Sequence, residues 1–186
     1  PIEFRPMPSY FRANIASMTG YVPGEQPQDP GSIKLNTNEN PYPPSPRVYA
    51  AMRKAINGSL RLYPEPLSDA LRSAAADVYG VKSSNIIAGN GSDELLSMVL
   101  RCFVGAGDRV AFPRPTYTLY DTLVEIHDGI RATVDYPEDF SLPAALAEQN
   151  AALTFLCNPN APSGTLVPLA EVEKLARAVS GVLVVD

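Results

Sequence analysis

Histidine and cysteine are scarce in this chain of 186 residues, which contains one histidine and two cysteines. Cys102 and Cys157 cannot build a disulfide framework or a cysteine-rich zinc site, and the single histidine, His127, leaves little for metal binding. The same scarcity weakens any proposal of a Cys-His or Ser-His-Asp catalytic arrangement. We therefore expect no metal site, and any chemistry must rest on other residue types.

Long apolar runs and an excess of positive charge are also missing. The apolar runs are too short for a membrane span, and the net charge of −5 argues against a nucleic-acid-binding surface. Residues Pro1–Arg5 lack the basic and then apolar start of a secretory signal. We expect a cytoplasmic protein without a membrane or nucleic-acid partner. Its 45% hydrophobic residues are enough for one compact domain with a sizeable core.

Helix starts and ends can be recognised after residue 45. Ser45 followed by Pro46 is typical of a helix N-terminus, and Gly58 is expected to end that helix. A second helix is expected after Pro66 and should end at Gly80. The apolar residues of both helices recur on one face, which predicts their burial. They are Val48, Met52, Ala55 and Ile56 in the first helix, and Leu67, Ala70, Leu71, Ala74, Ala75 and Val78 in the second.

The segments on either side of these helices follow different patterns. Residues 1–45 are rich in proline and show little periodicity, which predicts an arm lying over other parts of the protein, with a short strand at Ile33–Leu35. From residue 85 onward strands and helices alternate, which predicts an α/β layered domain with a largely parallel sheet. The expected strands are Asn85–Ala88, Arg109–Phe112, Ile130–Asp135, Leu153–Leu156 and Val182–Val185. The expected helices are Ser92–Val104, Thr116–Ile126, Pro143–Gln149 and a last one from Pro168 or Leu169 to about Val179.

The last expected strand, Val182–Val185, is entirely aliphatic, as in strands that are buried on both faces of a sheet. The chain stops directly after it, at Asp186. The loops that leave such strands are where open α/β sheets bind ligands. We therefore expect this chain to be a piece of a longer protein.

Four segments at the carboxyl ends of expected strands carry candidate chemistry. Gly89–Glu94 can hold a phosphate on free backbone N–H groups at a helix start, or can be a plain capped turn. Tyr117, held after two prolines, can stack on a flat ligand or pack on the surface. Asn158–Gly164 offers two carboxamides as donors, or only turn geometry. Asp186 can bind a metal, a ribose or a protonated ring nitrogen, or can cap a helix.

These four segments should meet at one edge of the sheet, where open α/β sheets bind ligands. Together they supply a phosphate cradle, a stacking ring, a hydrogen-bond donor and an anion. That combination suits a flat, phosphorylated heteroaromatic cofactor with a basic ring nitrogen. Pyridoxal 5'-phosphate (PLP) has all of these features, so the sequence predicts PLP as the cofactor.

Short motifs occur in order along essentially the whole chain: Tyr21–Gly24, Leu35–Tyr42, Arg61–Pro66, Gly91–Glu94, Pro115–Tyr117, Asn158–Gly164 and Val184–Asp186. They resemble the fold-type I PLP-dependent aminotransferases, and most of all the N-terminal half of the histidinol-phosphate aminotransferases. Asn-Glu-Asn-Pro together with Tyr-Pro-Glu-Pro is the specific combination. The resemblance implies an α/β/α layered large domain with a largely parallel sheet, here incomplete. Residues 1–45 would be an arm and the start of a small domain, and residues 46–186 the N-terminal part of the PLP-binding large domain.

The resemblance also implies roles for individual residues around the cofactor. The backbone of Gly91, Ser92 and Asp93 would hold its phosphate. Tyr117 would stack on its ring and Asp186 would face the ring nitrogen, which makes these two the catalytic candidates in this chain.

Other implied roles concern the substrate and a second subunit. Tyr63 would reach the cofactor phosphate of the neighbouring subunit, which implies a homodimer. Tyr21, Asn38 and Asn40 would lie near the substrate. The implied reaction transfers an amino group between L-histidinol phosphate and 2-oxoglutarate, in histidine biosynthesis.

The chain departs from the family pattern in two places. Ala161 stands where the family usually has the asparagine that bonds the cofactor's phenolic oxygen. Either Asn158 or Asn160 substitutes for it through a small loop shift, or the contact is lost. The Schiff-base lysine should lie beyond Asp186, because none of the lysines present follows a serine at the edge of a cofactor pocket. They are Lys34, Lys54, Lys82 and Lys174.

Two kinds of alternative remain open. A related PLP enzyme, either an aromatic aminotransferase or a decarboxylase of a phosphorylated amino acid, would use the same cleft. A non-catalytic phosphate-binding α/β module would use Gly89–Glu94, but it would have no reason to contain the Asn-Glu-Asn-Pro motif.

Overall fold

The computed structural model of this chain describes residues 10–21, 24–29 and 31–186. These residues form two compact units. One unit consists of the segment that ends at Tyr21 and the segment that begins at Gly89, and the other consists of the residues between them. The first nine residues of the predicted arm lie outside the described part, and the domain boundary expected at residue 45 stays a prediction.

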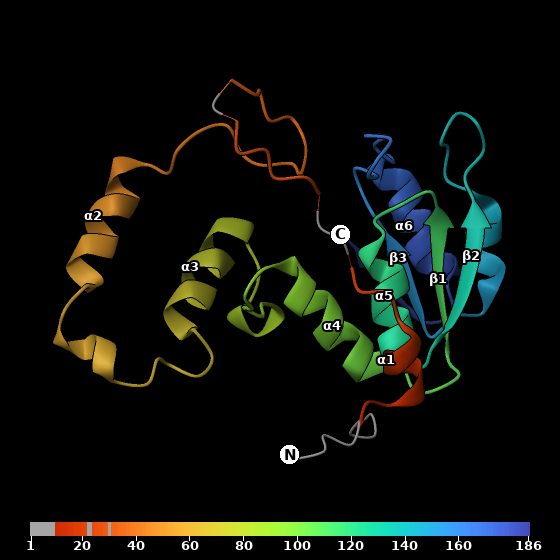
Figure 1. The fold of residues 1–186 in the computed structure, drawn as a ribbon, viewed down its shortest axis with the longest axis horizontal. Helices are drawn as coiled ribbons and strands as arrows, with labels where there is room; N and C mark the ends of the chain where they lie inside the picture. Colours follow the sequence, from red (N-terminus) through yellow and green to blue (C-terminus); the bar gives the residue numbers. More distant parts are fainter. Residues whose placement is uncertain (1–9, 22–23, 30) are drawn as a thin grey trace, which may run out of the picture. The chain divides into compact units, whose positions relative to one another are not determined.

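A four-stranded parallel sheet forms the centre of the first unit (Figure 1). Its strands are β1 (Arg109–Arg114), β2 (Ile130–Asp135), β3 (Leu153–Leu156) and β4 (Val182–Val185). They lie in the order β2-β1-β3-β4. Because all four run in the same direction, the loops that leave β1 and β3 and the residue that follows β4 gather at one edge of the sheet.

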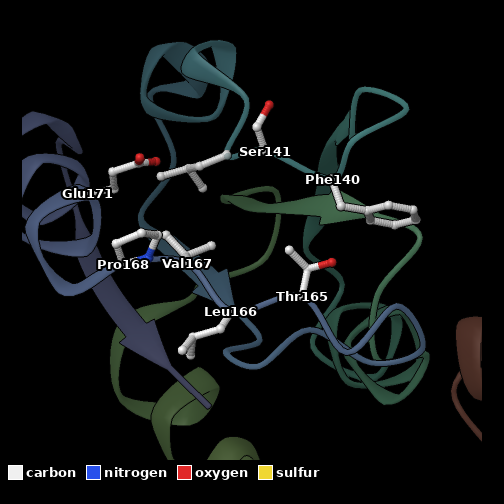
Figure 2. A pocket seen from close by; sticks show the side chains of 8 residues that line it. Phe140, Ser141, Thr165, Leu166, Val167, Pro168 and Glu171 are labelled. Carbon is white, nitrogen blue, oxygen red and sulfur yellow. The ribbon is translucent and has the colours of Figure 1, made fainter.

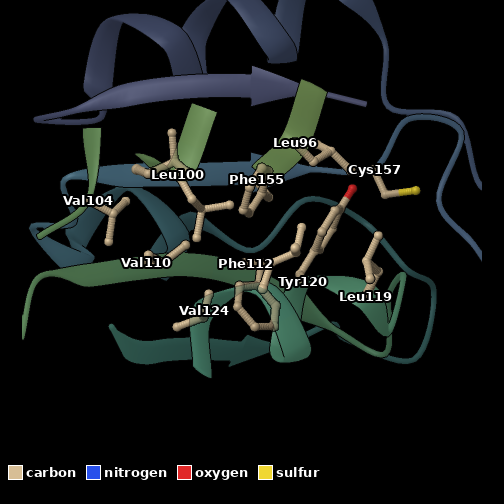
Figure 3. Packing of buried hydrophobic residues seen from close by; sticks show 12 residues of the cluster. Leu96, Leu100, Val104, Val110, Phe112, Leu119, Tyr120, Val124, Phe155 and Cys157 are labelled. Atoms are coloured by element: carbon tan, nitrogen blue, oxygen red, sulfur yellow. The ribbon is translucent and has the colours of Figure 1, made fainter. Parts of the chain in front are cut away.

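Helices cover both faces of this sheet. On one face, α4 (Ser92–Phe103) and α5 (Leu119–Ile126) pack on one apolar cluster (Figure 3), and on the other face η3 (Ala144–Gln149) and α6 (Leu169–Ala178) pack on a second. Val110 and Phe112 of β1 join the first cluster and Ala111 joins the second, as the alternation of side chains along a strand requires. The predicted α/β layered fold is confirmed. None of the helices in the described segments combines the length and apolar character needed to cross a membrane.

The described part of the arm docks on the end of α5. The arm contains the short helix α1 (Ala13–Ser17). Arg12 donates to the backbone oxygen of Ile126 at 2.6 Å and pairs with Asp128 at 3.1 Å, and Asn14 donates to the oxygen of Glu125 at 2.9 Å. Carbonyl groups in the last turn of a helix have no partner within the helix, so these donors satisfy them. This part of the arm lies over another element, as predicted.

The second unit contains the helices α2 (Pro46–Ala55) and α3 (Asp69–Tyr79) and the short 3₁₀ segments η1 (Gly58–Arg61) and η2 (Ser83–Asn85). The Ser45 hydroxyl accepts the N–H of Arg47 at 3.2 Å, so Ser45 caps α2 as predicted. Gly80 adopts the left-handed conformation (φ 65°) that ends α3, also as predicted. The helix α2 ends at Ala55, before Gly58.

The predicted burial of the apolar faces of α2 and α3 is wrong for this chain. Met52 is 61% exposed and Leu71 is 60% exposed, and Ala76 is the one buried residue that α3 provides. Exposure on this scale means that the described segments do not pack over these faces. An apolar stripe on a helix identifies the face that needs a partner, but it does not identify the partner.

Three expectations about strands also need correction. Ile33–Leu35 and Asn85–Ala88 are not strands, because each lacks a neighbouring strand among the described residues. Ile33 and Ile87 are correspondingly exposed. β4 has the predicted bounds, but its residues are only partly buried. It lies at the edge of the four-stranded sheet, where it pairs with β3 alone.

Candidate cofactor site

The N-terminus of α4 forms an open cradle of backbone N–H groups. Gly91 precedes the helix with φ 85°, a conformation that favours glycine, and a side chain at this position would meet no atom within 4 Å. No described residue caps this position with its side chain, so within the described segments the first N–H groups of α4 have no side-chain partner and can bind a ligand. The Glu94 carboxylate instead accepts the N–H of Asn90 at 2.5 Å, which holds the turn. An anion is the natural ligand for such a helix start.

Tyr117 lies next to this cradle. Its hydroxyl donates to Asp93 at 3.2 Å, which joins the loop after β1 to the first turn of α4. The Tyr117 ring meets Tyr21 and Tyr120 edge-on, with centroid distances of 6.2 and 5.6 Å. Burial, and then the contacts with Tyr21 and Asp93, raise the pKa of Tyr117, so the hydroxyl stays protonated at neutral pH. The predicted stacking residue and a predicted substrate residue are thus neighbours.

Asp186 follows β4 and is held by two elements. Its backbone N–H donates to Leu156 at 3.0 Å and its carbonyl accepts from Asn158 at 2.8 Å, which extends the pairing of β4 with β3. Its side-chain oxygen Oδ2 accepts the hydroxyl hydrogen of Tyr120 at 2.7 Å. Sequence reasoning missed Tyr120. The signal that could have found it is its position three residues after Tyr117, a spacing that puts two side chains on one face of a helix.

The two asparagines of the loop after β3 are engaged to different degrees. Asn160 is 2% exposed, its Oδ1 accepts from Thr116 at 2.8 Å, and its Nδ2 donates to Pro115 at 3.1 Å and to Ser163 at 2.9 Å. Both N–H bonds of that amide are therefore used. The Asn158 amide exchanges two bonds with the Val167 backbone.

In the two hydrogen bonds between the Asn158 side chain and the Val167 backbone, Nδ2 of Asn158 donates to the Val167 oxygen at 3.1 Å. The Val167 N–H donates to Oδ1 of Asn158 at 2.8 Å. A side-chain amide has two N–H donors, so among the described residues Asn158 has one donor without a partner and Asn160 has none. Of the two substitutes considered for the asparagine that Ala161 replaces, Asn158 is the one with a hydrogen-bond donor to give.

The first unit therefore brings together eight of the predicted site positions at one edge of its sheet. They are Tyr21, Gly91, Ser92, Asp93, Tyr117, Asn158, Asn160 and Asp186. Tyr63, Asn38 and Asn40 belong to the other unit, and their roles stay predictions. Tyr63 is fully exposed, Asn38 has φ 52°, and Asn40 accepts the N–H of Tyr42 at 3.0 Å.

A separate small pocket lies beside the asparagine loop and is not part of this cluster (Figure 2). Its walls come from the segment before η3 and from the start of α6, and Glu171 is the charged residue among those that line it. Its lining is mostly apolar and includes a carboxylate, which disfavours an anion such as a phosphate.

The strand-end cluster fits PLP on the observations above. The space over Gly91 and the uncapped start of α4 suit the phosphate. Tyr117 offers an aromatic ring, and the Asp186 carboxylate has a second oxygen besides the one that Tyr120 occupies. The residues present therefore match the phosphate, the ring and the ring nitrogen of that cofactor.

Comparison with known proteins places the chain in a family. The family described as aminotransferase class I and II matches residues 30–186. The chain belongs to this family. The resemblance to fold-type I aminotransferases noted in the sequence is thereby confirmed.

The most similar aminotransferases include enzymes with one shared name. The chain is 48% identical over 182 residues to histidinol-phosphate aminotransferase 1 of Trichormus variabilis, covering 97% of the chain and 52% of that protein. It is 46% identical over 176 residues to the histidinol-phosphate aminotransferase of Geotalea daltonii, covering 94% of the chain and 51% of that protein. The chain thus spans about half the length of the curated relatives it matches.

Solved structures of an aminotransferase and of a decarboxylase share the fold. The histidinol-phosphate aminotransferase of Sinorhizobium meliloti, solved in complex with PLP, matches with a TM-score of 0.73 and 34% identity, covering 81% of this chain and 42% of that one. The L-threonine-O-3-phosphate decarboxylase of Porphyromonas gingivalis matches with a TM-score of 0.61 and 24% identity, covering 74% of this chain and 43% of that one. The second match shows only that the fold is shared.

Proposed function

We propose that this chain is the N-terminal part of a PLP-dependent aminotransferase that transfers an amino group between L-histidinol phosphate and 2-oxoglutarate. One observation carries the proposal. A free helix start, an aromatic ring and a carboxylate meet at the carboxyl ends of parallel strands in a member of the aminotransferase family. The names of the relatives in Trichormus variabilis and Geotalea daltonii support the amino donor.

Each group at this edge has a role toward the cofactor. PLP, when bound, supplies an electron sink for negative charge that develops at the α-carbon of the amino donor. The backbone N–H groups of Gly91, Ser92 and Asp93 bind its phosphate. Tyr117 orients the ring by contact with its face, and its bond to Asp93 fixes it beside the phosphate cradle. Asp186 holds a proton on the ring nitrogen by charge pairing, which favours the protonated form.

The Asn158 amide donates to the phenolic oxygen of the cofactor in place of the family asparagine that Ala161 replaces. The donor that Asn158 retains supports this assignment. Asn160 acts indirectly, by joining the loop after β3 to Pro115 and Thr116 of the loop after β1.

Three residues act at or near the substrate, and one acts across a subunit interface. Tyr21 lies on the substrate side of the cofactor, and its contact with Tyr117 supports this role. The roles of Asn38 and Asn40 rest on the family resemblance alone. Tyr63 reaches the cofactor phosphate of a second subunit in a cytoplasmic homodimer. Its complete exposure is consistent with a role outside its own unit.

The function is tested with purified full-length protein, PLP and 2-oxoglutarate, by measuring the glutamate formed. L-Histidinol phosphate is compared with L-phenylalanine and with O-phosphothreonine as amino donors. We expect kcat/KM to be highest for L-histidinol phosphate. A higher value for L-phenylalanine, or release of carbon dioxide from O-phosphothreonine without glutamate, would overturn the proposed substrate. Asp186→Asn serves as the control that the glutamate comes from this site.

A further inference from the structure

We infer that Tyr120 is a positioning residue that fixes the Asp186 carboxylate toward the ring nitrogen of the cofactor. The inference rests on the proposed function, because it assigns a supporting group to the carboxylate that the function requires. The contact that carries it is the bond of 2.7 Å from the Tyr120 hydroxyl to Oδ2 of Asp186.

The Tyr120 side chain is a rigid donor. It is fully buried, its ring stacks on Phe155 at 4.5 Å with an interplanar angle of 7°, and Phe112 and Tyr117 meet it edge-on. In Figure 3 the ring lies among the buried residues between α4 and α5, with its hydroxyl directed toward Cys157. Close packing on several sides holds the hydroxyl in one place.

The Asp186 carboxylate needs such a donor. The backbone of Asp186 is fixed by Leu156 and Asn158, but its side chain lies at an exposed end of a strand. A carboxylate offers two oxygens to donors. The Tyr120 hydroxyl occupies Oδ2 and restrains the rotation of the carboxylate, which leaves Oδ1 for a second donor. A protonated ring nitrogen is a donor of that kind.

Tyr120 remains a donor over the whole working range of pH. Burial, and then the hydrogen bond with Asp186 and the nearby Cys157 thiol, raise the pKa of Tyr120 far above its usual value. The titratable groups that face the hydroxyl are therefore Asp186, after β4, and Cys157, after β3. The hydroxyl therefore keeps its proton at neutral pH, so its hydrogen bond to Asp186 does not switch off near neutrality.

Tyr136 provides a matched control from the same chain. Its hydroxyl is also buried and also lies near Cys157, with the pKa raised by burial to about 12, but it has no hydrogen-bond partner among the described residues. Tyr120→Phe and Tyr136→Phe each remove one buried hydroxyl and keep the ring. The two variants therefore differ in whether the lost hydroxyl touches Asp186.

The test is a double-mutant cycle in the full-length protein, with the dissociation constant of PLP as the main readout. Tyr120→Phe is made in the wild-type and in the Asp186→Ala background, which removes the side-chain oxygen that Tyr120 contacts. We expect it to weaken PLP binding about tenfold in the first and less than about twofold in the second, because the coupling is between these two side chains. Tyr136→Phe should leave the constant unchanged in both.

A second readout is the pH dependence of the visible absorption of the bound cofactor, which we expect to shift in Tyr120→Phe but not in Tyr136→Phe. An equal loss of PLP binding in both Asp186 backgrounds would assign Tyr120 a purely structural role and overturn the inference, as would no change in either readout. Neither readout uses a substrate, so these experiments test the role of Tyr120 independently of the proposed amino donor.

Discussion

At the scale of single residues, the chemistry depends most on Asp186. Asp186→Asn in the full-length protein keeps the shape and the Tyr120 contact but removes the charge that holds a proton on the ring nitrogen. We expect partial retention of PLP and a loss of at least roughly a hundredfold in the rate of α-proton transfer, on the order of 3 kcal/mol in the barrier. Exchange of the α-proton of L-histidinol phosphate with deuterium measures this rate. A rate near that of the wild type would show that the carboxylate only caps a helix and takes no part in proton transfer.

Asn160 should matter more for stability than for contact with the cofactor. Asn160→Ala leaves the Thr116 hydroxyl and the Pro115 carbonyl, both in the loop after β1, without their partner. We expect a loss of about 1–3 kcal/mol in the free energy of unfolding, measured with urea. Asn158→Ala is the comparison, and it should lower PLP affinity more than Asn160→Ala does in proteins that remain folded. If Asn160→Ala lowers PLP affinity more, the hydrogen bond to the cofactor belongs to Asn160 instead.

Single residues differ in how far the sequence could predict them. Tyr117 and Asp186 were predictable because each follows a recognisable strand, and the ends of parallel strands meet at one edge. The bond between Tyr120 and Asp186 joins residues 66 positions apart, and the bond between Thr116 and Asn160 joins residues 44 apart. Contacts of this kind depend on how strands and loops pack together, and no local pattern encodes them. For the same reason, the sequence could not show which of Asn158 and Asn160 has an N–H donor left for a ligand.

At the scale of elements, the helix cap at Ser45 allows a direct test of a sequence signal. Ser45→Ala removes the acceptor for the Arg47 N–H at the start of α2. We expect a loss of about 1 kcal/mol in the free energy of unfolding, while Ser45→Asp, which keeps an acceptor, should cost much less. Urea unfolding of the full-length protein measures both. Equal losses in the two variants would show that the cap does not stabilise α2.

The elements that were predicted correctly carry their own signals. β3 and β4 have the expected bounds because each is a short, mostly apolar run between clear breaks. β2 has them because apolar and polar residues alternate along it, and α4 begins after its glycine turn. Asn85–Ala88 has a similar apolar run but is not a strand, because a strand exists only when a neighbour pairs with it. The exposure of Met52 and Leu71 has a related cause: the pattern specifies the apolar face and leaves its partner open.

At the scale of the whole molecule, the account requires a second subunit. Tyr63→Phe should weaken PLP retention by about 1.5–3 kcal/mol, the range for a lost hydrogen bond to a charged group, without loss of folding or of the dimer. Equilibrium dialysis measures PLP retention, and size-exclusion chromatography measures the dimer. Unchanged retention in a dimer that forms normally would remove Tyr63 from the site. Tyr49→Phe, an exposed tyrosine on α2, is the matched control.

The central claim is that the strand-end edge of the first unit is the PLP site of an aminotransferase. Borohydride reduction of the full-length protein with bound PLP, followed by mass mapping of its peptides, tests this claim most directly. The account predicts a single modified lysine per subunit, outside residues 1–186. A stoichiometric modification of Lys34, Lys54, Lys82 or Lys174, or no modification at all, would contradict it.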